Sequence, residues 1–280
     1  MGGPKERVVL AALCAWPGEV LSNDRLTDAL WGDDPPKTSA KLIQNLVLHL
    51  RKTLGHELIE TRPSGYVLHV RPETVDARRF ERLVTQGRDQ ASDGMPAAAV
   101  ATFARALELW RGPPLDELAD WAPAQAEAAR LQELRRCAQE EQADAALALG
   151  RHREWVGHLE SLAANEPLRE RRWALLMLAQ YRCERQADAL RSFQRARASL
   201  IELGLEPGPE LQTIEHGIAA RDQSLLSLSA DGSGMATLPT GVVSFLLTDI
   251  ERSSELWERA SSTMAYLAIS ERSRHISVKW

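Results

Sequence analysis

The sequence predicts a mainly α-helical protein, in which a winged helix-turn-helix with a small β-hairpin is followed by a helical repeat domain like that of tetratricopeptide repeat (TPR) proteins. Three observations predict this fold class. Residues 22–70 show two helices separated by a Pro-Pro turn and followed by a hairpin. From about residue 75 to residue 221 the chain is rich in Ala, Leu, Arg and Glu, which favour helix. Part of this stretch repeats with a period of about 34 residues.

The chain has 280 residues, which is long enough for two domains with separate cores. We expect a winged-helix domain over residues 1–72, without an N-terminal strand layer, and a TPR-like domain over residues 73–223. Residues 224–241 are rich in Ser, Gly, Ala and Thr, which predicts a flexible linker. Residues 242–280 open with a short apolar strand and are too few for an independent domain.

The first helix is expected over residues 4–15. Pro4 suits the first helical position, because its fixed φ matches a helix and an N–H is not needed there. Apolar residues recur along this stretch at helical spacing. Trp16-Pro17-Gly18 then ends the helix.

Leu21-Ser22 predicts the start of the second helix. The side chain of Ser22 can cap the free N–H groups, and Leu21 can pack on Leu26 one turn later. This helix stops at Trp31-Gly32. Pro35-Pro36 then forces the chain to turn.

The third helix is expected over residues 39–54, with Thr38 or Ser39 as its cap and Gly55 at its end. Strands near residues 57–61 and 65–70 flank Arg62-Pro63-Ser64-Gly65, where Pro and Gly occupy turn positions. The hairpin completes the domain.

The third predicted helix has two unlike faces. At about 100° per residue, its apolar stripe faces the first two helices through Ile43, Val47, Leu50 and Leu54. The opposite face is polar and basic except for Leu48, which can contact a thymine methyl group or mark a protein-contact surface. Asn and Gln can read adenine edges, and Lys can pair with guanine or phosphate. We therefore expect this helix to enter the major groove of double-stranded DNA beside the hairpin. The candidate DNA contacts are Lys41, Gln44, Asn45, His49, Arg51, Lys52, Arg62, Ser64 and Tyr66.

The net charge of the chain is −5, so DNA binding requires a local basic patch. Such a patch lies in the predicted winged helix, where six basic residues are accompanied only by Glu57 and Glu60. The six are Lys37, Lys41, Arg51, Lys52, Arg62 and Arg71.

The second domain should be a series of helical hairpins. Helix breaks fall at Asp93-Gly94, Gly112-Pro113-Pro114, Gly150, Asn165-Glu166-Pro167 and residues 204–209. The repeat signal consists of three degenerate copies, which predicts stacked hairpins that form a binding scaffold. An irregular helical bundle with Ala/Leu periodicity is the alternative.

Catalytic and metal-binding patterns are missing from the sequence. Cys14, Cys137 and Cys183 are isolated, and the seven histidines show no ligand spacing. Asp249 follows the apolar strand of residues 241–247, but one carboxylate does not hold a catalytic metal pair. No signal peptide or long apolar run is present. We expect a cytoplasmic protein that is not an enzyme and has no cofactor, metal or membrane partner.

Several motifs together carry a family resemblance, which covers roughly residues 2–223. They are Gly2-Gly3-Pro4-Lys5, Leu26-Thr27-Asp28-Ala29-Leu30-Trp31-Gly32-Asp33-Asp34-Pro35-Pro36, Leu50-Arg51-Lys52-Thr53-Leu54-Gly55, Pro63-Ser64-Gly65-Tyr66, Val75-Asp76-Ala77-Arg78-Arg79-Phe80, Leu109-Trp110-Arg111-Gly112 and Leu203-Gly204-Leu205-Glu206-Pro207-Gly208-Pro209-Glu210-Leu211. With them the chain resembles the streptomycete antibiotic regulatory protein type of activator, an OmpR-like winged helix followed by a bacterial transcriptional activator domain. Residues 245–257 resemble the start of a class III nucleotide cyclase domain, truncated here, in which Asp249 would take a metal-binding position.

The resemblance implies a sequence-specific DNA-binding transcriptional activator that acts at promoters with RNA polymerase. It implies polymerase contact near the turn that runs from Trp31 to Pro36, and paired protomers, a homodimer, on directly repeated sites. The alternative is a helical-repeat interaction scaffold with a degenerate DNA-binding domain. Leu46 and Leu48, which stand where family members usually carry polar residues, motivate that alternative, as does the expected lack of a strand layer.

Overall fold

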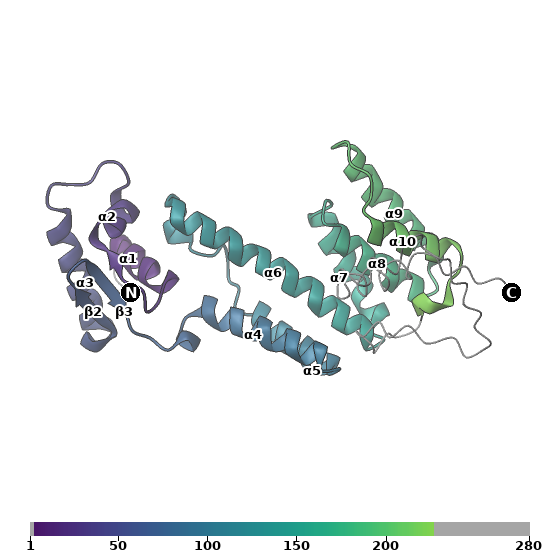
Figure 1. Cartoon of the computed structure of the whole chain (residues 1–280), viewed down its shortest axis with the longest axis horizontal. Coiled ribbons are helices and arrows are strands. Elements are labelled where there is room, and N and C mark those ends of the chain that lie inside the picture. The colour runs from purple at the N-terminus through teal and green to yellow at the C-terminus, as the bar shows by residue number, and fades with distance from the viewer. Residues whose placement is uncertain (1–2, 227–280) are drawn as a thin grey trace, which may run out of the picture. The chain divides into compact units, whose positions relative to one another are not determined.

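The computed structural model describes residues 3–226 (Figure 1). The described residues all belong to one compact unit of the chain. Most of the predicted linker and the whole cyclase-like segment with Asp249 lie outside the described residues. The cyclase-like character of that segment therefore stays a prediction.

The N-terminal part of the chain contains the three predicted helices. They are α1 (Pro4–Ala15), α2 (Asn23–Trp31) and α3 (Ser39–Leu54). The cap of α2 is confirmed, because Ser22 Oγ accepts a hydrogen bond from the backbone N–H of Arg25 at 3.2 Å. Thr38 occupies the N-cap position of α3, but its side chain makes no capping hydrogen bond. Gly32, with φ of 57°, ends α2 in a backbone conformation that favours glycine.

A three-stranded antiparallel sheet accompanies these helices. Its strands are β1 (Leu21–Ser22), β2 (Ile59–Arg62) and β3 (Gly65–Leu68), in the order β1-β3-β2. The predicted hairpin is confirmed, but its first strand starts later than residue 57, because His56–Leu58 forms a 3₁₀ helix, η1. Strand β1 was not predicted. A Cβ atom at Gly65 would lie 2.0 Å from the carbonyl oxygen of Leu21, so only glycine lets β1 approach β3 this closely.

Seven helices form the second part of the described chain. They are α4 (Asp76–Ser92), α5 (Pro96–Leu107), α6 (Ala122–Ala148), α7 (His152–Asn165), α8 (Glu170–Arg182), α9 (Gln186–Ile201) and α10 (Pro209–Ala219). Three short 3₁₀ helices lie before, between and after them: η2 (Pro72–Thr74), η3 (Asp116–Leu118) and η4 (Gln223–Leu226). Helix α7 begins at His152 and α9 at Gln186, which fits the predicted period of about 34 residues. Helix α6, with 27 residues, is longer than the helices of a regular hairpin repeat.

Two apolar cores stabilise the helical domain. Phe80, Leu83 and Phe103 form the core between α4, α5 and α6. Trp173, Leu175 and other side chains from α6 to α10 form the second core. The first core joins the apolar stripes of neighbouring amphipathic helices. In the second core, α8 is buried on most of its faces, at nine of its thirteen residues.

A buried ion cluster joins α6 to α8 and the chain just before it. Glu140 accepts hydrogen bonds from Arg172 Nε at 3.1 Å and from Arg169 Nε at 2.7 Å. The side chains of Arg172 and Glu140 are only 3% and 9% exposed. Arg172 also donates to the backbone oxygen of Leu162 at 3.0 Å, so the cluster reaches α7 as well.

A second, more exposed cluster joins α4 to α6. Arg130 donates from Nε to Glu127 at 2.7 Å and also contacts Glu81 of α4. Arg78 lies 4.0 Å from Glu127. The hydrogen bond from Arg130 is the main cause that lowers the pKa of Glu127 below its ordinary value of 4.5.

This lowered pKa predicts an acid-sensitive link between α4 and α6. A carboxyl group whose pKa is lower in the folded state stabilises the fold above its unfolded pKa, and it loses that contribution as the pH falls through the folded value. Urea unfolding between pH 7 and pH 3 should therefore show stability falling below about pH 4.5. The fall should be shallower in Glu127→Gln, and an equal pH dependence in the variant would contradict the assignment.

Candidate nucleic-acid interface

Helix α3 presents one face to the core and one to solvent. Ile43, Val47 and Leu50 are buried, at 0%, 1% and 6% exposure. This outcome confirms the predicted apolar stripe except at Leu54, which is 39% exposed because it lies at the end of the helix. The opposite face is exposed at five positions: Lys41, Gln44, Asn45, Leu48 and Lys52. Lys41, Asn45, Leu48 and Lys52 follow one another at spacings of four, three and four residues, which places them in one row along the helix.

Arg51 ties α3 to the hairpin. Its Nε and Nη2 atoms donate to the backbone oxygen of Ile59 at 2.9 and 2.7 Å, and Nη2 also donates to Thr61 Oγ1 at 2.7 Å. Figure 1 shows α3 beside β2, the strand that holds both acceptors. The guanidinium group is therefore occupied within the domain, and it fixes the position of the hairpin relative to α3.

His49 lies at the side of α3 that faces α1. Its Nδ1 atom is 3.1 Å from Glu6 Oε1, while its side chain is 58% exposed. The imidazole thus has a partner on α1 and also reaches solvent. It lies at the edge of the exposed row.

The hairpin contributes an exposed tip. Arg62 and Ser64 are exposed, and Arg62 Nη2 lies 3.0 Å from Glu60 Oε2. Glu60 also contacts His69 at 2.7 Å, and this hydrogen bond is the main cause that lowers the pKa of Glu60. Part of the positive charge of the tip is thereby compensated inside the hairpin.

Tyr66 is placed differently from the prediction. It is 6% exposed and belongs to the core that α1, α2 and α3 share with the sheet. Burial raises the pKa of its phenol group. All four residues of β3 are buried, so this strand lacks the usual alternation of inward and outward side chains. The tyrosine ring therefore packs in the core and supports the fold, and little of the side chain is exposed.

The turn between α2 and α3 is also exposed. Residues 32–35 reach solvent, and two acidic residues, Asp33 and Asp34, lie at the start of the turn. Lys5 Nζ lies 4.8 Å from the ring centroid of Trp31, which anchors the turn to α1 through a cation–π contact.

Sequence reasoning missed the contact between the helical domain and the winged helix. Trp121, just before α6, donates from Nε1 to Asp28 Oδ2 on α2 at 2.8 Å. Its ring packs edge-to-face on Trp16, with centroids 5.5 Å apart, and Arg25 lies over both rings. Leu118 and Ala124 join the same core. The available signal was a tryptophan in a Pro-rich connection, which does not by itself identify its partner.

Within residues 3–226, no three His, Cys, Asp or Glu side chains are placed so that they could hold a metal ion. Cys14, Cys137 and Cys183 are free and half-buried. The described part of the chain also contains no helix that is both long and apolar enough to span a bilayer.

A three-helix unit with a hairpin beside an exposed polar third helix defines the winged helix-turn-helix class of DNA-binding domains. Residues 2–68 match the family model described as transcriptional regulatory protein, C terminal, and residues 75–219 match that of the bacterial transcriptional activator domain. The chain belongs to the bacterial transcriptional activator domain family and is a transcriptional regulator. This outcome confirms the main part of the predicted resemblance.

Curated relatives agree with this assignment. The regulatory protein DnrI of Streptomyces peucetius is 33% identical over 233 residues, which cover 79% of this chain and 86% of DnrI. The transcriptional regulator RedD of Streptomyces coelicolor is 35% identical over 235 residues, covering 81% of this chain and 67% of RedD. The transcriptional regulatory protein EmbR of Mycobacterium tuberculosis is 36% identical over 224 residues, but the match spans only 58% of EmbR. All three relatives are named as regulators.

The fold is also similar to a solved structure. The structure of Mycobacterium tuberculosis EmbR in complex with a low affinity phosphopeptide matches with a TM-score of 0.76 and 33% sequence identity. The match covers 80% of this chain and 62% of that chain. It supports the order of a winged helix followed by a helical domain.

Proposed function

We propose that this regulator binds double-stranded DNA through α3 and the hairpin, and that it activates transcription together with RNA polymerase. The observation that carries the proposal is the exposed row Lys41, Asn45, Leu48 and Lys52, which lies opposite the buried stripe of α3. A helix with this arrangement fits the major groove, where Asn reads adenine and Lys contacts guanine or phosphate.

The exposed contacts predicted from the sequence divide into three groups. Lys41, Gln44, Asn45 and Lys52 are exposed and lack a partner within residues 3–226, so they are the proposed groove contacts. Arg62 and Ser64 at the hairpin tip are the proposed contacts to the flanking backbone. His49 is a peripheral contact, because Glu6 already occupies its Nδ1 atom.

Leu48 is part of the proposed reading face. It is 43% exposed in the middle of the polar row, and a leucine side chain there can pack on the C5-methyl group of thymine. Arg51 acts indirectly in this proposal, because its bonds to Ile59 and Thr61 fix the angle between α3 and the hairpin.

Residues 1–72 supply DNA binding in this proposal, and residues 73–223 supply contacts between protomers or with other proteins. Polymerase contact is assigned to the exposed turn of residues 32–35, whose acidic residues suit a basic partner surface. Paired protomers would occupy directly repeated half-sites. A regulator that acts in this way works in the bacterial cytoplasm.

Replacement of Lys41 and Lys52 by alanine tests the groove assignment. The double variant should bind a duplex from the region upstream of its own gene more weakly, and the slope of log K against log salt should fall by about 0.9 for each phosphate that the variant no longer neutralises. Fluorescence anisotropy at several salt concentrations measures both quantities. Arg153→Ala, an exposed change on α7, is the matched control.

An unchanged salt slope in the Lys41 and Lys52 variant would contradict the assignment of α3 to the groove. If the wild-type protein binds neither this duplex nor any other, the result favours the alternative, which is a helical-repeat interaction scaffold with a degenerate DNA-binding domain. A pull-down of protein partners would then be the next measurement.

A further inference from the structure

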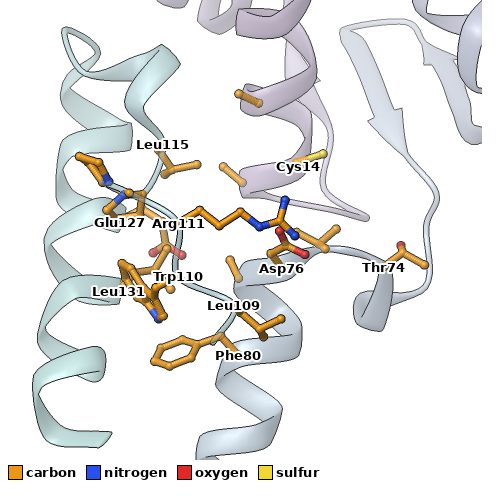
Figure 2. A pocket seen from close by; sticks show the side chains of 17 residues that line it. Cys14, Thr74, Asp76, Phe80, Leu109, Trp110, Arg111, Leu115, Glu127 and Leu131 are labelled. Atoms are coloured by element: carbon orange, nitrogen blue, oxygen red, sulfur yellow. The ribbon is translucent and has the colours of Figure 1, made fainter. Parts of the chain in front are cut away.

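A cavity of about 440 Å³ lies where the winged helix meets the helical domain (Figure 2). Its walls come from the end of α1, residues 74–80 at the start of α4, the connection over residues 109–115 and the N-terminal third of α6. None of the residues that line it belongs to α3 or to the hairpin. The cavity is therefore separate from the proposed DNA interface, and its size falls within the range of small-molecule sites.

Most of the lining is apolar. Ala15 comes from α1, Phe80 from α4, Leu109 and Leu115 from the connection, and Leu131 from α6. Cys14 adds a thiol that stays protonated, because burial and then the charge of Asp76 raise its pKa to about 11. These walls suit a compact apolar group, and the thiol introduces no negative charge among them.

Three charged side chains line the cavity, and they differ in the interactions that they make within the protein. Glu127 is already paired with Arg130 at 2.7 Å. Asp76 lies in the first turn of α4, where the positive end of the helix dipole stabilises a carboxylate. Arg111 is exposed and, among residues 3–226, makes no hydrogen bond or ion pair. Figure 2 shows the Arg111 side chain extending from the connection across the cavity toward the side of Asp76 and Cys14. Among the residues that line the cavity, Arg111 supplies the one cationic group, and no carboxylate of residues 3–226 is paired with it.

We propose that this cavity binds a small organic monocarboxylate with an apolar body, whose carboxylate pairs with Arg111. A guanidinium group matches a carboxylate with two parallel hydrogen bonds. A phosphate monoester fits less well, because it brings nearly two negative charges close to the carboxylate of Asp76, whereas a monocarboxylate brings one. A ligand at this position contacts both domains. Its affinity therefore depends on how the winged helix and the helical domain are placed relative to each other.

The test uses the full chain and four probes that share one ring system: 2-naphthoate, 2-naphthalenemethanol, 2-naphthyl phosphate and 2-naphthylmethylamine. Isothermal titration calorimetry should show that 2-naphthoate binds most tightly. The neutral alcohol should bind about tenfold more weakly, since it lacks the charge-assisted hydrogen bonds. The phosphate should also bind more weakly than the carboxylate.

Two variants locate the site. Arg111→Gln should weaken 2-naphthoate about tenfold and leave the affinity for the alcohol unchanged. Ala77→Leu, which fills part of the cavity, should weaken both probes. Arg153→Gln is the matched control and should change neither. Circular dichroism and the thermal midpoint verify that each variant is folded.

Four outcomes would overturn the proposal. One is that none of the probes binds the wild-type protein up to its solubility limit. The second is that the phosphate or the amine binds more tightly than the carboxylate. The third is that Arg111→Gln weakens the alcohol as much as 2-naphthoate. The last is that the folded Arg111→Gln and Ala77→Leu variants both retain wild-type affinity for 2-naphthoate.

Discussion

Replacement of Trp121 by alanine is expected to lower the free energy of unfolding by about 3–5 kcal/mol, the usual cost of truncating a buried aromatic side chain. Trp121 is 4% exposed. The variant lacks the edge-to-face packing on Trp16, the cation–π interaction with Arg25 and the hydrogen bond to Asp28. Urea denaturation followed by far-UV circular dichroism measures the change.

Two controls separate the contributions of this residue. Trp121→Phe keeps an aromatic ring but cannot donate to Asp28, so it should lose only about 1–2 kcal/mol. Trp155→Ala truncates a half-buried tryptophan on α7 and should cost less than Trp121→Ala. Equal losses in Trp121→Ala and Trp155→Ala would contradict a special role for the contact between the domains.

The second large effect is expected at Glu140. Glu140→Gln removes the carboxylate that accepts from Arg169 and Arg172 and leaves the buried guanidinium of Arg172 with less compensation. Loss of one partner of a buried ion pair costs about 3–5 kcal/mol, and the lower end of this range is expected here because Arg172 keeps Glu166 at 2.9 Å. The thermal midpoint and urea unfolding at pH 7 measure this loss.

The neighbouring residue provides a matched control. Glu141 pairs with Arg88 at 2.9 Å, but its side chain is 35% exposed and that of Arg88 is 44% exposed. Glu141→Gln should therefore cost at most about 1 kcal/mol. The double variant Glu140→Leu/Arg172→Leu should recover part of the stability lost in Glu140→Gln, because no buried charge is left without its partner. If Glu140→Gln and Glu141→Gln cost the same, the buried cluster does not stabilise the fold as argued.

The helices could be predicted because their signals are local. Pro4, Ser22, Gly32 and Gly55 mark helix ends through their own backbone preferences, and the apolar stripe of α3 follows from spacing alone. The family motifs then identified the class of regulator, which the comparisons confirm. These features require no knowledge of distant contacts.

The rest depends on contacts between distant residues. Strand β1 has only two residues, and its partners on β3 lie more than forty positions away in the sequence. Local β-strand propensity therefore does not predict it. Tyr66 was expected to contact DNA, yet it lies in the core, and β3 is buried along its whole length. Arg51 was expected to contact DNA, and only the structure shows that the backbone oxygen of Ile59 and Thr61 Oγ1 accept its hydrogen bonds.

The position of Leu118, Trp121 and Ala124 in the winged-helix core has a consequence for how such regulators can be recombined. A family boundary near residue 70 divides the sequence, but it does not divide the core. In a chimaera that takes its winged helix from one relative and its helical domain from another, the two parts of this core come from different proteins, and their side chains are not matched in shape. The segment of residues 115–124 packs with the DNA-binding half. A domain exchange therefore keeps the core intact only when this segment and the winged helix come from the same relative.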